Sequence, residues 1–171
     1  MANDTIFVVY GAWLERDFQL PLAALGSATV AIGAAELLAE VLTALLADRV
    51  GLARAAIGGV VATAAAYLLL PVAARTLPLA LGALFVAFLA FEFTVVTALG
   101  LITEVLPDAR GTMMGAFGAT GSAGRMLGAL TGGYVWLWGG LAATGCVAAA
   151  LSLLALGSLL WGLRGWHPRP V

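Results

Sequence analysis

The sequence has no lysine, one cysteine and one histidine, and it has few charged residues of either sign. Charged side chains make up 10% of the 171 residues, and a net charge of −1 provides no basic surface for nucleic acid. Cys146 stands alone in an apolar run, which excludes a disulfide framework and a thiolate metal site. His167 follows the last apolar run, so we interpret it as a solvated or interfacial residue.

Apolar residues are abundant, at 63% of the sequence, which is more than a soluble domain of this length needs. The composition therefore predicts an all-α membrane protein with several spanning helices. The start, Met1 to Thr5, has no basic stretch and no small-residue cleavage site. We therefore expect the spanning helices themselves to direct the chain to the membrane, most simply a bacterial inner membrane.

Six apolar runs divide the chain, with no long linker, soluble domain or low-complexity tract between them. A bilayer core is about 30 Å thick and needs about 20 helical residues, so the short first run predicts only part of a helix. The pattern predicts five full transmembrane helices plus this partial first helix, in a single domain over residues 1–171. We expect the helices at residues 5–14 (partial), 21–47, 55–72, 77–105, 112–138 and 141–163.

One arginine, Arg125, interrupts the fifth run near its middle. A charge at that depth costs roughly 2.5–3.5 kcal/mol even on lenient insertion scales, so it needs a partner. Small residues at helical spacing share the face of Arg125, and small residues allow another helix to approach closely. We predict helix packing on this face at Gly118, Gly121, Gly128 and Gly132.

The candidate partners are three glutamates inside apolar runs, Glu36, Glu40 and Glu92. From the helix rise, Glu92 and Arg125 each lie roughly 22 Å from the turn that joins their two helices. Opposite charges on antiparallel helices are therefore expected at one depth. Glu36 and Glu40 lie roughly 18 and 12 Å from Asp48, where the turn after their own helix begins. Three helices therefore carry ionisable groups toward the middle of the membrane.

Three carboxylates and one guanidinium leave a surplus of negative charge. A carboxylate without a cation in a poorly solvated site is easier to protonate, so it can take up and release a proton. We predict a substrate and proton site of a proton-coupled transporter at Glu36, Glu40, Glu92 and Arg125. The alternative is a static network, protonated or ion-paired, that fixes helix packing.

The residues give no support to enzyme chemistry. Glu36 and Glu40 are one helical turn apart, but no histidine accompanies them to bind a metal. His167 lies in the tail, so no Ser–His or Cys–His set exists, and the glycines have helix-packing spacing instead of forming a phosphate-binding loop. We expect no enzyme activity, no metal and no cofactor.

Arginine placement predicts the orientation in the membrane. The turn after the second run, the turn after the fourth run and the C-terminal tail share one side. The positive-inside rule places that side, with the C-terminus, in the cytoplasm. The other side carries only Arg16 and Arg75, whereas the cytoplasmic side carries Arg49, Arg54, Arg110, Arg164 and Arg169.

Four stretches resemble, in order, the C-terminal half of transporters of the major facilitator superfamily, in its drug- and sugar-efflux branch. LLADRVGLAR (Leu45–Arg54) resembles the second copy of the family's Asp-Arg-x-Gly loop signature. FEFTVVTALGLITEVLPDARGT (Phe91–Thr112) is similar to the tenth helix and the following loop, and GRMLGALTGG (Gly124–Gly133) to the eleventh helix. YGAWLERDFQL (Tyr10–Leu20) resembles the end of the seventh helix.

The resemblance implies one six-helix half of an efflux transporter that works by alternating access with a second half. The signature's first glycine is replaced by Ala44, and its basic pair is reduced to Arg54. The resemblance also implies a cytoplasmic gating network at Asp48, Arg49, Gly51, Glu104 and Arg110.

The expected partners are the lipid bilayer and either an N-terminal transporter half or a second copy of the chain. A function of another class stays open, that of a non-transporting subunit in a larger membrane complex, with a transporter half used for packing. No nucleic acid partner is expected from the charge.

Overall fold

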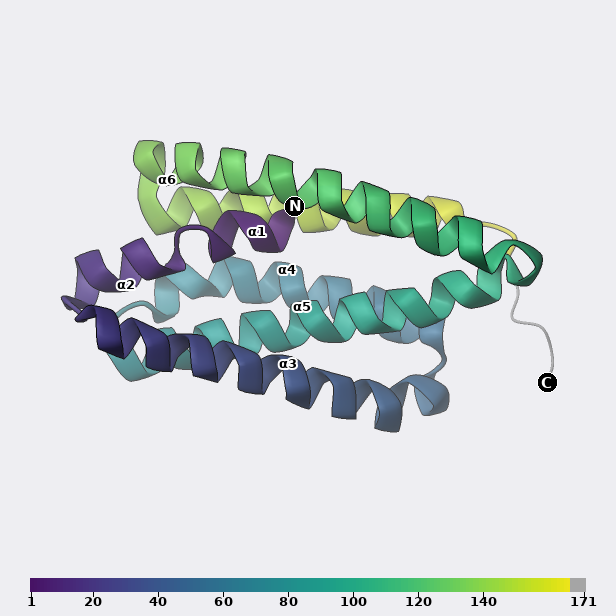
Figure 1. The fold of residues 1–171 in the computed structure, drawn as a ribbon, viewed down its shortest axis with the longest axis horizontal. Helices are drawn as coiled ribbons and strands as arrows, with labels where there is room; N and C mark the ends of the chain where they lie inside the picture. Colours follow the sequence, from purple (N-terminus) through teal and green to yellow (C-terminus); the bar gives the residue numbers. More distant parts are fainter. Residues whose placement is uncertain (167–171) are drawn as a thin grey trace.

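The computed structural model describes residues 1–166, apart from the side chains of Leu22 and Asp48. It is an all-α bundle, with no strand in the described residues (Figure 1). Four of the described helices, α3 to α6, are long and apolar enough to cross a membrane, which confirms the predicted all-α membrane fold. The elements are α1 (Ala2–Phe7), α2 (Tyr10–Phe18), α3 (Leu22–Val50), α4 (Leu52–Ala73), α5 (Leu77–Val105), the 3-10 turn η1 (Pro107–Ala109) and α6 (Arg110–Gly162).

Helix α6 consists of two antiparallel legs that meet at Gly140 (Figure 1). The φ and ψ angles of Gly140 are 61° and −155°, a conformation that residues with a side chain rarely adopt. The first leg (residues 110–139) and the second leg (residues 141–162) are each long enough to span a bilayer. The reversal lies where the sequence separates the predicted helices 112–138 and 141–163.

The turns alternate between the two ends of the bundle. Gly51, with a φ of 90°, is the single residue between α3 and α4. It lies at the same end as η1 and the end of α6, whereas the links from α2 to α3 and from α4 to α5 lie at the other end, with Gly140 (Figure 1). The turns that share an end are therefore those that the arginine pattern assigns to one side of the membrane.

The N-terminal segment differs from the single partial helix predicted at residues 5–14. The chain forms two short helices, α1 and α2, with a break at Val8 and Val9. The amide of Val9 donates to the carbonyl oxygen of Ile6 at 3.1 Å, which is a three-residue turn instead of an α-helical bond. β-Branched residues are weaker helix formers, so a valine pair is a favourable place for this break.

Helix α2 also continues past the predicted end at Leu14, through the charged cluster that follows. The ring of Trp13 contacts that of Phe18, with centroids 6.1 Å apart. The guanidinium of Arg16 lies 4.4 Å from the ring centroid of Trp136, beside the α6 reversal. The helix therefore extends because its apolar side chains pack inward while the charges remain at the surface.

Glycines allow the closest contacts of α4 with its neighbours. A Cβ atom at Gly59 of α4 would lie 2.5 Å from Oγ1 of Thr94 on α5. A Cβ atom at Gly145, in the second leg of α6, would lie 2.6 Å from the carbonyl oxygen of Tyr67 on α4. Side chains do not approach so closely, so these helices pack through small residues, as membrane helices commonly do.

The outer surface of the bundle is apolar. Leu137 is 85% exposed and Trp138 is 84% exposed, at the end of the first leg of α6. Val30 of α3 and Leu154 of the second leg are also exposed. Apolar side chains without cover are normal on helices that face lipid, and the aromatic residues near a helix end suit the interface.

Candidate functional site

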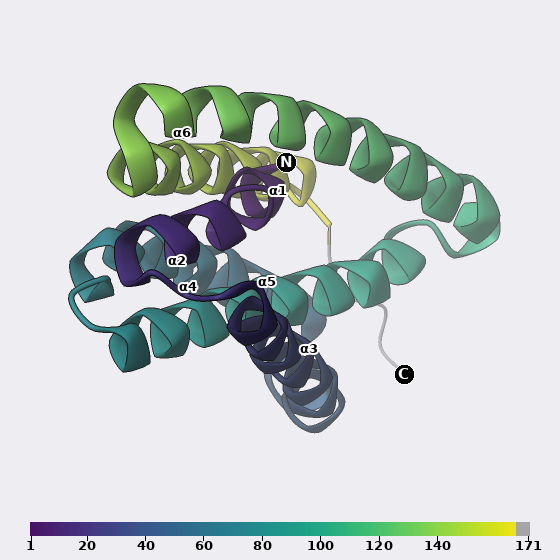
Figure 2. The ribbon, with the colours of Figure 1, turned by 60° about the vertical axis from the view of Figure 1, so that its left-hand side comes forward.

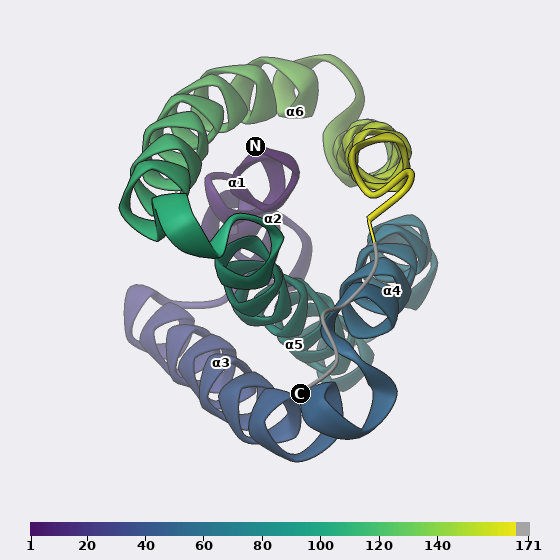
Figure 3. The same cartoon turned by 90° about the vertical axis from the view of Figure 1, so that its right-hand side faces the viewer.

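A cavity of about 530 Å³ lies between α1, α3, α5 and the first leg of α6. Figure 3 shows α1 enclosed between α6 and α5, and Figure 2 shows the first leg of α6 separated from α5 with α1 between them. The first leg packs on α1 at Gly128 and Gly132, and α6 makes few contacts with α5. This separation leaves room for the cavity near the middle of the long helices.

Three of the four residues predicted for the substrate and proton site line this cavity: Glu36 of α3, Glu92 of α5 and Arg125 of α6. The fourth, Glu40, is exposed on α3 and is not part of the cavity wall. Within residues 1–166, no three His, Cys, Asp or Glu side chains are placed to hold a metal ion. The aromatic part of the wall consists of Phe7, Phe88, Phe91 and Phe117.

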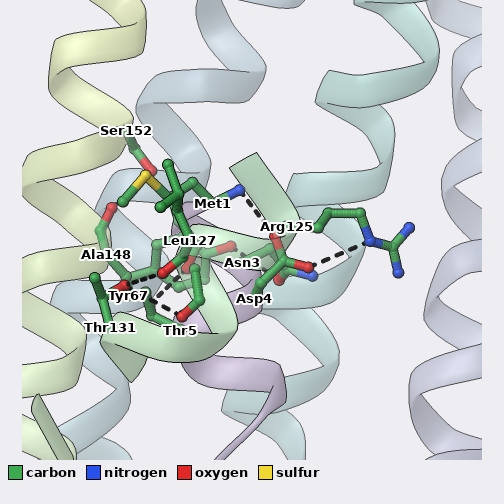
Figure 4. A network of polar contacts seen from close by, with 12 residues as sticks. Met1, Asn3, Asp4, Thr5, Tyr67, Arg125, Leu127, Thr131, Ala148 and Ser152 are labelled. Atoms are coloured by element: carbon green, nitrogen blue, oxygen red, sulfur yellow. Dashed lines mark hydrogen bonds and ion pairs between the residues drawn. The ribbon is translucent and has the colours of Figure 1, made fainter. Parts of the chain in front are cut away.

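The ion-pair partner of Arg125 is Asp4 of α1, where the sequence predicts a glutamate. The Nε atom of Arg125 lies 3.5 Å from Oδ1 of Asp4 (Figure 4). The other oxygen of Asp4 accepts a hydrogen bond from the amino group of Met1 at 2.8 Å. No ion pair joins Arg125 to Glu36, Glu40 or Glu92, all of which the structure describes.

Two of the four predicted packing glycines explain why α1 lies beside Arg125. A Cβ atom at Gly128 would lie 2.8 Å from Cβ of Asp4, and one at Gly132 would lie 2.6 Å from Cα of Thr5. The backbone of α1 therefore occupies the space that side chains would fill. Gly118 and Gly121 have no such neighbour within 4 Å and line the cavity instead.

A buried hydrogen bond holds a second face of α1. The hydroxyl of Tyr67 on α4 donates to Oδ1 of Asn3 at 3.0 Å, and both side chains are buried. An unpaired polar group in this position would carry the full cost of desolvation, so the bond fixes the rotation of α1 about its axis. Helix α1 is thus held between α4 and α6.

Replacing Gly132 with alanine is expected to destabilise the bundle, because the new methyl group would meet the backbone of Thr5 and displace α1. We expect a loss of about 1–3 kcal/mol, the usual cost of overpacking, measured as a lower melting temperature in detergent. Gly133→Ala is the matched control, since a Cβ atom there has no neighbour within 4 Å. Equal melting temperatures for the two variants would contradict the close contact.

The residues predicted for the gating network lie at the end of the bundle that contains the Gly51 turn. Arg49, Glu104 and Arg110 are exposed, and no ion pair joins these three residues to one another. Gly51 forms the turn itself, with its positive φ angle. The side chain of Asp48 lies outside the described part of the chain.

Asp4 and Asn3 are the site residues that the sequence reasoning misses. The predicted first helix begins at Thr5, so both polar residues lie before it. The available signal was a carboxylate directly before an apolar run, on a chain that carries an unpaired arginine in another helix.

Residues 1–171 match the sequence profile of the Major Facilitator Superfamily over their whole length. The chain belongs to this superfamily. It is similar to the uncharacterized MFS-type transporter YceJ of Bacillus subtilis (strain 168), with 24% identity over 134 residues, which cover 78% of this chain and 34% of YceJ. No solved structure matches the chain.

Membership of the Major Facilitator Superfamily makes the chain an integral membrane protein of a transporter family, in agreement with its apolar spanning helices. The region shared with YceJ spans about a third of the length of that relative.

Proposed function

We propose that the chain forms the C-terminal six-helix half of a proton-coupled secondary transporter that exports small molecules of the drug or sugar class. The observation that supports this most directly is that Arg125 lines the same cavity as Glu36 and Glu92, which belong to two other long helices. Ionisable residues inside membrane spans are costly and mark substrate and proton pathways. The first helix of this half is represented by α1 and α2.

The surplus of carboxylates supports proton coupling. Arg125 is paired with Asp4, and neither Glu36 nor Glu92 has an ion-pair partner among the described residues. A charged carboxylate without a cation is costly where water is excluded, so it binds a proton when the cavity closes and releases it when water returns. A change of access from one side of the membrane to the other then moves the proton.

Alternating access requires a second half opposite the cavity. Arg125, Gly118 and Gly121 line the cavity and are exposed, so its wall is open along the first leg of α6. The match to YceJ covers only 34% of that transporter, which leaves length for another bundle of similar size. An N-terminal half is the proposed partner. If the purified chain forms a dimer, a second copy of the chain would take that place.

The gating network is proposed at the end of the bundle that carries the Gly51 turn. Arg49, Glu104 and Arg110 are charged and exposed there, and the resemblance adds Asp48. Contacts of these charges with the second half would hold the cavity closed on that side. We propose that this side, with the C-terminus, faces the cytoplasm and that the membrane is a bacterial inner membrane.

Transport in proteoliposomes tests the proposal. The chain is reconstituted with its N-terminal half, and efflux of ethidium or radiolabelled lactose is followed under an imposed pH gradient. We expect export of at least one probe that stops when a protonophore collapses the gradient, and no export by the chain alone. Export that is indifferent to the gradient would contradict proton coupling. No export of either probe would favour a packing subunit of a larger complex.

A further inference from the structure

We propose that Asp4 is a positioning residue for Arg125, which holds the guanidinium by its Nε edge and keeps it from pairing with Glu36 or Glu92. This inference rests on the proposed transport function of the same cavity. Through Asp4, helix α1 contributes a charge to the cavity, although Asp4 is not among the site residues predicted from the sequence.

The geometry of the pair makes Asp4 the fixed partner. Oδ1 of Asp4 lies 3.5 Å from Nε of Arg125, and the outer nitrogens of the guanidinium point away from Asp4 (Figure 4). The side chain of Asp4 is 15% exposed, whereas that of Arg125 is 76% exposed. A long, exposed arginine has many rotamers, so the short, half-buried carboxylate selects the one that it occupies.

The position of Asp4 is itself set by the packing of α1. Gly128 and Gly132 bring the backbone of α1 against α6, one and two turns beyond Arg125. The buried bond between Asn3 and Tyr67 directs one face of α1 toward α4. Neighbouring residues on a helix point about 100° apart, so this contact turns Asp4 away from α4 and toward the cavity.

The charges of the cavity compete for one guanidinium. Helix α1 supplies Asp4 and the amino group of Met1, α3 supplies Glu36, α5 supplies Glu92, and α6 supplies Arg125. Asp4 fixes the Arg125 side chain in a rotamer in which it makes no ion pair with Glu36 or Glu92. Both glutamates therefore remain available to exchange protons or to bind substrate. Without the charge of Asp4, Arg125 is free to pair with one of these glutamates and to remove it from exchange.

The test uses the complete transporter and the probe that it exports. Asp4→Asn is expected to lower the rate of proton-driven export about tenfold. It should also move the pH midpoint of export to lower pH, because Arg125 is then free to pair with one of these glutamates. Asp4→Glu keeps the charge and should leave the midpoint near the wild-type value. Asp17→Asn is the matched control, since Asp17 pairs with Arg16 outside the cavity.

A rate and midpoint for Asp4→Asn equal to those of Asp17→Asn would overturn the proposal. So would equal losses for Asp4→Asn and Asp4→Glu with an unmoved midpoint, which would indicate packing alone. If Asp4→Asn does not accumulate in the membrane, two other variants are compared. One is Arg125→Asp alone, and the other is the double variant Asp4→Arg/Arg125→Asp, in which the two charges are swapped. Recovery of export in the double variant supports the pair, and no recovery rejects it.

The two proposals fail in different ways. A wild-type transporter whose export ignores the pH gradient rejects the proposed function and the role of Asp4 with it. A proton-driven wild type in which Asp4→Asn changes neither rate nor midpoint rejects only the role of Asp4.

Discussion

Replacing Arg125 with alanine is expected to lower proton-driven export by at least about a hundredfold while the protein still inserts into the membrane. The variant leaves Asp4, Glu36 and Glu92 on one cavity wall without the guanidinium that lies among them. The cavity then has no cation to hold a substrate or to balance these carboxylates. Insertion persists because removing a charge from a spanning helix lowers the cost of burial.

Export of the probe in proteoliposomes, normalised to the amount of protein in the membrane, measures this effect. Arg75→Ala is the matched control, because Arg75 is an exposed residue in the link between α4 and α5. It should retain export within about twofold, as expected for a surface charge. Wild-type export by Arg125→Ala would reject the site.

Replacing Glu92 with glutamine is expected to lower the rate of net proton-driven export about a hundredfold. Exchange of the probe at equal pH on both sides of the membrane should be preserved. Glutamine has nearly the shape of a protonated glutamate but cannot release a proton. Exchange needs only the movement of the loaded transporter, whereas net export requires the carboxylate on α5 to gain and lose its proton in each cycle.

The two modes are measured on the same proteoliposomes, with and without an imposed pH gradient. Glu15→Gln makes the same chemical change at an exposed position of α2, outside the cavity, and should leave both modes intact. Loss of exchange together with net export in Glu92→Gln would show that the side chain supports the structure of the cavity, with no separate part in proton transfer.

The meeting of Glu36, Glu92 and Arg125 in one cavity follows from simple properties of the sequence. Long helices are nearly straight, so the number of residues from a turn determines the depth of each charge. Short links make successive helices antiparallel, which brings residues of equal depth together. Glu40 is one turn farther along α3, about 6 Å away and rotated by about 40°, and this displacement places it outside the cavity wall.

The sequence shows a carboxylate before an apolar run, but it does not specify that Asp4 packs beside Arg125. This packing depends on the break at Val8 and Val9, which lie in a uniformly apolar run, and on α1 packing against Gly128 and Gly132. Hydrophobic periodicity predicts which face of a helix is buried but not which neighbour covers it. An arginine with three candidate glutamates therefore pairs with a fourth carboxylate.

The stripe of small residues on α6 shows the same limit. Gly118 and Gly121 have the spacing of packing residues, as do Gly128 and Gly132, but only the second pair touches another backbone. The difference arises because α1 is too short to cover the whole stripe, and α6 makes too few contacts with α5 to cover the rest. The exposed part of the stripe forms cavity wall.

The single-residue turn at Gly51 limits how α3 can move. A link of one residue spans only about 3.5 Å, so α3 and α4 cannot slide apart at that end and can change only their mutual tilt. Glu36 lies fifteen residues from this pivot, roughly 22 Å along the axis. A rotation of ten degrees would carry its carboxylate by about 4 Å, enough to make or break a contact with a guanidinium. A tilt of α3 about Gly51 would therefore change the distance between Glu36 and Arg125 across the cavity.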